Sequence, residues 1–185
     1  MTRIKTAWIS LALLLALPAL AAEPALEKVE LKRVSIDTMA IGTLERLFAE
    51  SPQAGKDYDN SVAYAVFDNF KVAVILSGGG GVGVAVDKTT GDRTYMKMGT
   101  GGIGLGLGGQ SYQVVFMFRT ERAYQRFVTK GWQADASANA VAGTTGKNAE
   151  STFASDVAVY QITNKGLMAQ ADVSGTKYWP SKLNE

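Results

Sequence analysis

Two glycine runs have the spacing of a phosphate-binding fingerprint. Gly78-x-Gly80-x-x-Gly83 and Gly104-x-Gly106-x-x-Gly109 both match Gly-x-Gly-x-x-Gly. In a dinucleotide-binding fold this turn opens a helix, and the N-terminus of that helix receives the pyrophosphate. Here both runs continue as an alternation of glycine with aliphatic residues, which is a strand pattern. We therefore expect no nucleotide, and we interpret the glycines as faces that another segment of backbone can approach closely.

Side chains for catalysis are scarce in this sequence. The chain has no histidine and no cysteine, which excludes Ser-His-Asp and Cys-His arrangements and nitrogen- or sulfur-rich zinc sites. Ser174-x-x-Lys177 has serine–lysine nucleophile spacing, but it lies at a strand end and not at a helix start. Asp57-x-Asp59 resembles the start of a calcium loop, yet Val62 stands where that loop needs glycine, so we interpret the pair as a solvated turn. We expect no catalytic residue, no metal and no cofactor.

One cluster of bases could act at a lipid surface. Lys28, Lys32 and Arg33 alternate with the apolar residues Val29, Leu31 and Val34. Such a segment could hold cations over headgroups while its apolar side chains enter the interface. Each cation contributes about 1 kcal/mol at an anionic surface, so three alone give weak attachment. A solvated basic face accounts for the cluster at least as well. The same two interpretations apply to four downstream bases: Arg119, Arg122, Arg126 and Lys130.

The N-terminus has the three parts of a secretory signal. Arg3 and Lys5 precede an apolar run over residues 7–17, and Ala-Leu-Ala follows at residues 19–21. This predicts a signal peptide over residues 1–22, cleaved after Ala21 or Ala22, and a periplasmic or secreted protein. The apolar run is too short to span a bilayer, which takes roughly 20 residues.

The charge balance argues against nucleic acid as a partner. The chain has 19 lysines and arginines against 17 aspartates and glutamates, and without Arg3 and Lys5 the balance is 17 against 17. A nucleic-acid-binding domain normally carries a clear basic excess. Residues 23–185 have the length of one domain, and no linker divides them.

The elements that would position these residues follow from the hydrophobic period. Residues 23–33 fit an arm, a strand or a first helix. An i, i+3, i+4, i+7 stripe then predicts an amphipathic helix over Ile36–Phe48, ending before Pro52. Downstream, a helix capped by Thr120 ends at Gly131.

From residue 61 onward the hydrophobic period is two, which predicts strands. The expected strands are Ala63–Phe67 and Lys71–Leu76 on either side of Asp68-Asn69, a hairpin turning at Thr89–Asp92, Tyr112–Phe118, an alanine-alternating strand over residues 134–142, and Phe153–Ile162 and Leu167–Val173. The sequence predicts an α+β domain with a largely antiparallel sheet, curled or closed toward a barrel or sandwich.

The order of these segments resembles the SYLF domain family. The residues that carry the resemblance are Ala65–Phe67, Gly78–Gly83, Gly101–Ser111, Val114–Phe118, Ala134–Ser137, Gly143–Gly146, Val159-Tyr160 and Lys165–Leu167. The resemblance implies binding of lipids, especially anionic or phosphoinositide headgroups, without enzymatic activity. Eukaryotic members bind membranes partly through an amphipathic segment at the start of the domain. Actin, which eukaryotic members also bind, is not expected where a secreted chain resides.

The sequence therefore leaves two candidate functions to be tested. The first is non-catalytic binding of a lipid or membrane surface in the bacterial envelope, with Lys28, Lys32 and Arg33 as the contact residues. The alternative is a structural or protein-interaction module of the periplasm, which would use the glycine- and alanine-faced strands as contact surfaces.

Overall fold

The computed structural model describes residues 19–73, 76–103, 108–133, 153, 156–163, 166–168 and 176–185. The chain begins with α1 (Ala19–Glu50), one continuous helix that includes the segment 23–33 and the predicted cleavage site. Residues 1–18 of the predicted signal peptide lie outside the described residues. As expected, α1 ends before Pro52.

A second helix, α2 (Pro52–Asp59), follows at once where the sequence predicted a turn. Proline suits the first turn of a helix, because its missing N–H would have no partner there. The Ser51 hydroxyl accepts a hydrogen bond from the Ala54 amide at 3.2 Å and so caps α2. The prediction of a solvated turn at Asp57 is wrong, since this carboxylate is only 2% exposed. It accepts hydrogen bonds from the Tyr160 hydroxyl at 2.6 Å and from Gln53 Nε2 at 3.0 Å.

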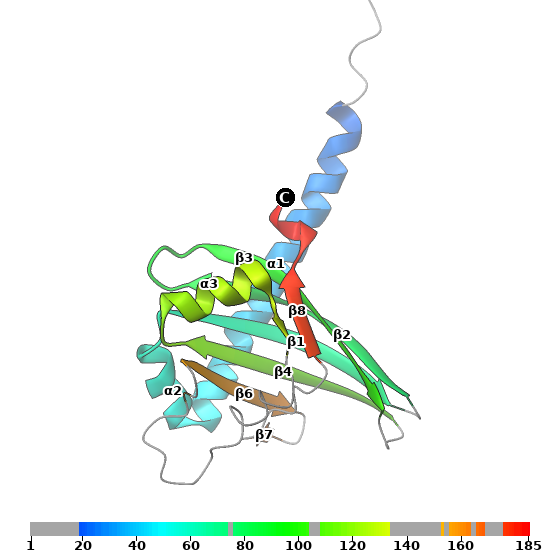
Figure 1. The fold of residues 1–185 in the computed structure, drawn as a ribbon. Helices are drawn as coiled ribbons and strands as arrows, with labels where there is room; N and C mark the ends of the chain where they lie inside the picture. Colours follow the sequence, from blue (N-terminus) through cyan, green and yellow to red (C-terminus); the bar gives the residue numbers. More distant parts are fainter. Residues whose placement is uncertain are drawn as a thin grey trace, which may run out of the picture.

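The strands form one antiparallel sheet with the order β5-β8-β3-β2-β1-β4-β6-β7. Their bounds are β1 (Ala63–Ala73), β2 (Leu76–Asp87), β3 (Arg93–Ile103), β4 (Gly108–Phe118), β5 (Trp132–Gln133), β6 (Val157–Thr163), β7 (Gly166–Met168) and β8 (Thr176–Pro180). The sheet is curled, and its described strands end in β5 on one side and β7 on the other without closing (Figure 1). The predicted α+β class is confirmed.

Two strand predictions are corrected by the structure. Asp68 and Asn69 do not separate two short strands, because β1 runs through them and both pair with β2 and β4. The predicted strands end with Leu167–Val173, but the structure adds β8 (Thr176–Pro180), which pairs with β3. The predicted strand over residues 134–142 and the loop over 143–148 lie outside the described residues.

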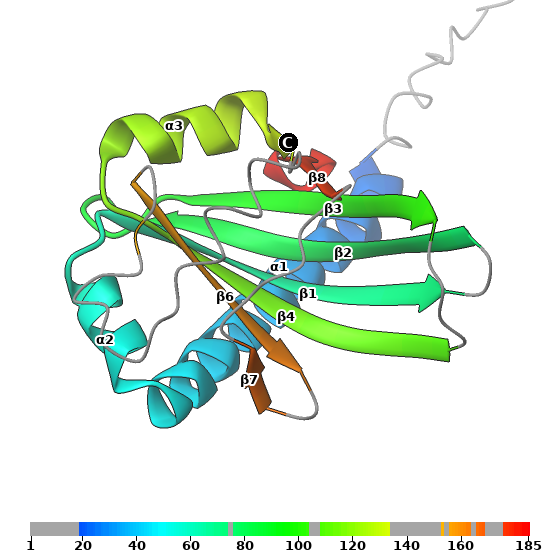
Figure 2. The same ribbon diagram turned by 60° about the horizontal axis from the view of Figure 1, so that its bottom comes forward.

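Each face of the sheet carries its own hydrophobic core. On one face α1 packs through Ile36, Ala40, Leu44 and Leu47, together with α2. On the other face α3 (Glu121–Lys130) packs its aromatic and aliphatic side chains over an aromatic cluster. Figure 2 shows α3 and α1 on opposite sides of the strands. Because β4 lies between β1 and β6, its residues are buried alternately in the two cores, which explains why this strand is apolar on both faces.

The local turn predictions are confirmed. Thr120 caps α3 by accepting a hydrogen bond from the Ala123 amide at 3.4 Å. Gly131 at the C-terminus of α3 has φ 69°, and Gly91 in the β2–β3 hairpin has φ 78°. Glycine adopts these positive φ values without the steric cost that a Cβ imposes.

Candidate functional site

The N-terminal part of α1 projects beyond the sheet and carries exposed apolar side chains (Figure 1). At about 100° per residue, Leu31 lies opposite the buried Ala40, and Val34 and Ile41 lie about 120° and 100° around the helix from it. All three are exposed, and Leu31 is 63% accessible. This stripe therefore faces away from the body of the protein.

Two of the three predicted bases border that stripe. Lys28 and Lys32 are exposed one turn apart, on the same flank of Leu31. Neither forms an ion pair with the described residues. We call Lys28, Leu31, Lys32, Val34 and Ile41 the α1 outer face, which spans about 180° of the helix from Ile41 to Lys32 with Leu31 in its middle part. A helix with cations beside exposed apolar groups can lie in a membrane interface.

The third predicted base, Arg33, points to the other side of α1. Its Nε donates a hydrogen bond to the Leu183 carbonyl at 2.8 Å, and its Nη2 donates to the same oxygen. Its guanidinium also pairs with Glu30 at 3.5 Å and lies 5.7 Å from the centroid of the Tyr95 ring. Arg33 therefore fixes α1 to the body instead of extending the row of free cations.

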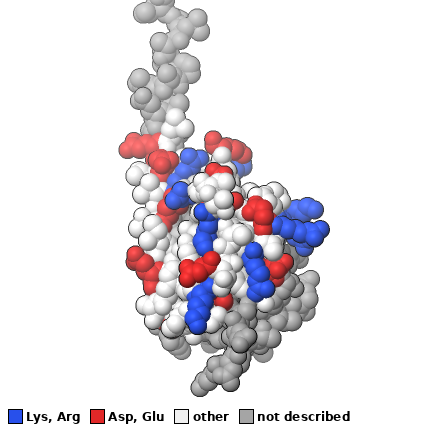
Figure 3. All heavy atoms as spheres, turned by 90° about the vertical axis from the view of Figure 1, so that its left-hand side faces the viewer, with Lys and Arg blue, Asp and Glu red and all other residues white. Residues whose placement is uncertain are grey.

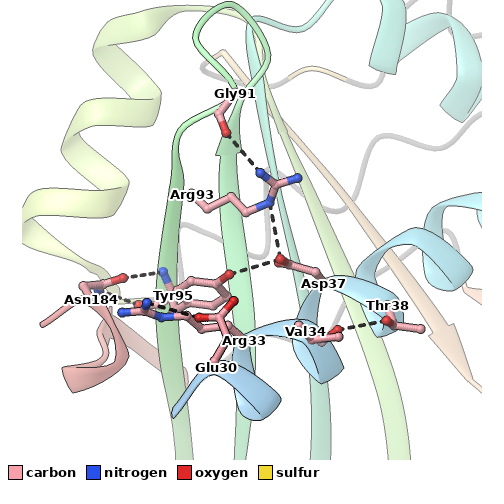
Figure 4. Close-up of polar contacts among 9 residues, drawn as sticks. All are labelled: Glu30, Arg33, Val34, Asp37, Thr38, Gly91, Arg93, Tyr95 and Asn184. Carbon is pink, nitrogen blue, oxygen red and sulfur yellow. Dashed lines mark hydrogen bonds and ion pairs between the residues drawn. The ribbon is translucent and has the colours of Figure 1, made fainter. Parts of the chain in front are cut away.

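Further polar contacts hold α1 against β3 close to Arg33 (Figure 4). The Tyr95 hydroxyl donates to Asp37 Oδ2 at 3.1 Å, and Arg93 Nε pairs with the same oxygen at 3.4 Å. Burial and the hydrogen bond to Asp37 raise the pKa of Tyr95, so its hydroxyl keeps the proton that it donates. We call Arg33, Asp37, Arg93, Tyr95 and Asn184 the α1 latch.

The C-terminus completes the latch from the far end of the chain. Asn184 accepts a hydrogen bond from the Tyr95 amide at 2.7 Å and donates one to the Tyr95 carbonyl at 2.9 Å. No local pattern in the sequence indicates this contact, because its two partners lie 89 positions apart. The i, i+4 spacing of Arg33 and Asp37 could have shown that the two share one side of a helix.

Three of the four downstream bases lie on the opposite side of the sheet. Arg122, Arg126 and Lys130 are exposed on α3, as the helical spacing predicted, and Arg119 precedes that helix. The Arg119 guanidinium lies 4.4 Å from the centroid of the Phe153 ring. The face drawn in Figure 3 shows lysine and arginine interspersed with aspartate and glutamate. The described residues on that face form no extended surface of a single sign, so their long-range attraction to an anion is weak.

The described residues offer little for chemistry or for spanning a membrane. They include no group of three His, Cys, Asp or Glu side chains placed to hold a metal. None of the helices in the described ranges is both long enough and apolar enough to cross a bilayer. Gly78–Gly83 lie within β2 and open no helix, which contradicts a dinucleotide site there. Ser174 lies outside the described residues, and Lys177 is exposed on β8.

Two comparisons with known proteins bear on this site. Residues 99–183 match the family model described as Ysc84, Las17-binding protein actin regulator. Beta cell expansion factor A of Aeromonas veronii is 42% identical over 150 residues, which are 81% of this chain and 58% of that protein. The chain thus spans less than two thirds of the length of this curated relative. The family match begins in β3, so α1 precedes it in the chain.

Proposed function

We propose that this protein binds the surface of an anionic membrane through the α1 outer face. The match of residues 99–183 to the Ysc84 family, whose description names a binding protein, supports a non-catalytic binding role. The observation that carries the proposal is the exposed stripe of Leu31, Val34 and Ile41 beside two free lysines. Apolar groups gain free energy on leaving water, and lysines are attracted to anionic headgroups.

The α1 latch supports this role by fixing the outer face before contact. Arg33 and Asp37 hold the inner side of α1 to β3 and to the C-terminus, so the outer side remains free. A helix that is already folded does not lose backbone entropy when it reaches the membrane. Preorganisation therefore leaves more of the contact energy for attachment.

We further propose that the protein acts in the periplasm or outside the cell after cleavage near Ala22. The position of Pro24 in α1 supports a mature N-terminus near Ala22. In the uncleaved chain Pro24 lies inside a helix that begins at Ala19, where a proline lacks the N–H for a backbone hydrogen bond. After cleavage it falls in the first helical turn, where that N–H would have no partner in any case. Mass spectrometry of the exported protein tests the cleavage site.

The test of membrane binding is cosedimentation of the purified protein with neutral and anionic vesicles at low and moderate salt. Lys28→Glu/Lys32→Glu removes two attractions of about 1 kcal/mol each and adds two repulsions, so we expect at least about a 30-fold loss of affinity. Arg122→Glu/Arg126→Glu is the matched control, because it reverses the same number of charges on an exposed helix on the other side of the sheet.

Three outcomes decide the proposal. Salt-sensitive binding that only the α1 variant weakens supports it. If only the α3 control variant weakens binding, the membrane contact lies on the other face of the sheet. Absence of binding to every vesicle refutes lipid attachment and favours the alternative, a module of the envelope that binds another protein.

A further inference from the structure

A second exposed apolar surface lies on the sheet itself, away from α1. On the face of the sheet that carries α1, four large side chains of β1, β2 and β8 are exposed: Phe70, Val72, Val82 and Trp179. Phe70 is 51% accessible and Trp179 is 38% accessible. Figure 2 shows the ends of β1, β2 and β4 extending past α1 and α3. We call these four residues the distal patch.

The strand register places the distal patch on one continuous surface. Val82 pairs with Lys97, and Lys97 pairs with Trp179, so these three side chains form one row across β2, β3 and β8. Phe70 and Val72 follow in the next rows of β1. With strands about 4.8 Å apart and residues about 3.3 Å apart, the patch measures roughly 14 Å by 13 Å.

Glycines give this surface its shape. The Trp179 ring lies against Gly99, 3.0 Å from where a Cβ would stand, and the Phe70 ring lies equally close to Gly109. Beside the rings, in the row of Val72, the backbone is bare, because a Cβ at Gly78 or Gly101 would meet no described atom within 4 Å. Both rings therefore lie along the sheet surface, beside a shallow floor of backbone.

Cations accompany the apolar groups. Lys97 stands in the row between Val82 and Trp179, and Lys177 pairs with Gly99 one row further along the strands. Both lysines are exposed. Asp68 pairs with Val82, and burial raises the pKa of its carboxyl group, which weakens its negative charge toward acidic pH. The surface thus combines aromatic and aliphatic side chains with net positive charge.

We infer that the distal patch is a second lipid-contacting surface, which enters the boundary between headgroups and acyl chains of an anionic bilayer with Lys97 and Lys177 at the phosphates. The inference rests on the proposed membrane function. Trp and other amphipathic aromatic residues favour this boundary, where the ring is desolvated and its polar atom stays wet.

A bilayer explains this surface better than a second copy of the chain does. A two-fold dimer would place the patch against itself and bring Lys97 and Lys177 toward their own copies. Its area of roughly 200 Å² is also far below the roughly 800 Å² per partner of a stable dimer. An anionic surface instead complements both lysines, and shallow insertion requires no large area.

The experiment uses Trp179 as its own probe. The chain has three tryptophans, and Trp8 lies in the predicted signal peptide, so Trp132→Phe leaves Trp179 as the single fluorophore of the mature protein. Anionic vesicles with lipids brominated near the headgroup should quench its emission and shift it to the blue, whereas a patch that stays in water keeps its spectrum. Circular dichroism checks that this variant is folded.

A charge variant tests the same surface independently of tryptophan. Gly101→Glu places a negative charge at the patch where a side chain has room, and we expect about a fivefold loss of affinity for anionic vesicles. Gly55→Glu is the matched control, because it has equal room on α2, away from the patch.

The outcomes separate this inference from the proposed function. If the protein sediments with vesicles while Trp179 is not quenched and Gly101→Glu binds normally, the inference fails and the function stands. If the unaltered protein binds no vesicle, both fail. If sedimentation equilibrium shows a dimer that Gly101→Glu dissociates, the patch is an interface between two copies and the inference is overturned.

Discussion

Replacing Leu31 by serine tests whether the α1 outer face enters the apolar part of a membrane. Full burial of a leucine side chain is worth about 1.5–3 kcal/mol. Leu31 is 63% exposed in the free protein, so its insertion can contribute about 1–2 kcal/mol. We expect Leu31→Ser to weaken binding to anionic vesicles about 5- to 25-fold. Stability should change by less than about 0.5 kcal/mol, since an exposed side chain packs against little.

Two comparisons make this prediction specific: the effect of salt on the loss of affinity, and a control substitution at a second exposed leucine. The loss from Leu31→Ser should be the same at low and high salt, whereas Lys28→Gln/Lys32→Gln should lose its effect as salt screens the surface. Leu26→Ser is the matched control, because Leu26 is 68% exposed but lies about 140° around the helix from Leu31. Equal losses from both leucine variants would show that α1 lies on the membrane along another face. No loss from Leu31→Ser would refute the outer face as an insertion surface.

Three further predictions concern the scaffold. Tyr160→Phe removes a hydrogen bond to the buried Asp57 carboxylate and should lower the free energy of unfolding by about 1.5–3 kcal/mol in urea titrations. Burial raises the pKa of the Asp68 carboxyl group in the folded state, so the folded state holds this proton more tightly than the unfolded chain, whose pKa is about 3.9. The free energy of unfolding therefore falls as pH rises through the interval above about 3.9. Asp68→Asn should be more stable than the unaltered protein at neutral pH and lose this advantage in acid, as thermal unfolding across pH would show. Gly81→Ala should destabilise by more than 1 kcal/mol in the same titrations, because its Cβ would overlap β1, whereas Gly101→Ala should be nearly neutral.

Local patterns predicted those parts of the fold that depend on a few neighbouring residues. Thr120, Gly131 and Gly91 act within one turn of the chain, and all three were identified correctly. β1 was wrongly divided because Asp68-Asn69 interrupts its apolar pattern. Asn69 fits inside the sheet only because Gly81 on the neighbouring strand lacks a side chain and leaves room for it. Such compensation between strands cannot be read from one segment alone.

The candidate site was predicted in composition but not in orientation. The sequence singled out Lys28, Lys32 and Arg33, yet residues 23–33 fitted an arm, a strand or a helix equally. Only a helix puts Arg33 on the side opposite Leu31, at about 200° around the axis. Its acceptor, the Leu183 carbonyl, is 150 residues away in the sequence. No periodicity links a side chain to a carbonyl at such a separation, so the α1 latch required the structure.

The glycines of β2 have two separate roles, one on each face of the sheet. On the face that carries α3, a Cβ at Gly79, Gly81 or Gly83 would overlap backbone oxygens of β1. Cβ atoms of directly paired residues normally stand about 4.5–5.5 Å apart, so these overlaps reflect the close approach of the two strands in the curled sheet. On the face that carries α1, Gly78 and Gly80 have room for a side chain. The close strand approach therefore explains the glycines on the α3 face. The glycines on the α1 face leave the backbone at the distal patch bare for a contact with another molecule.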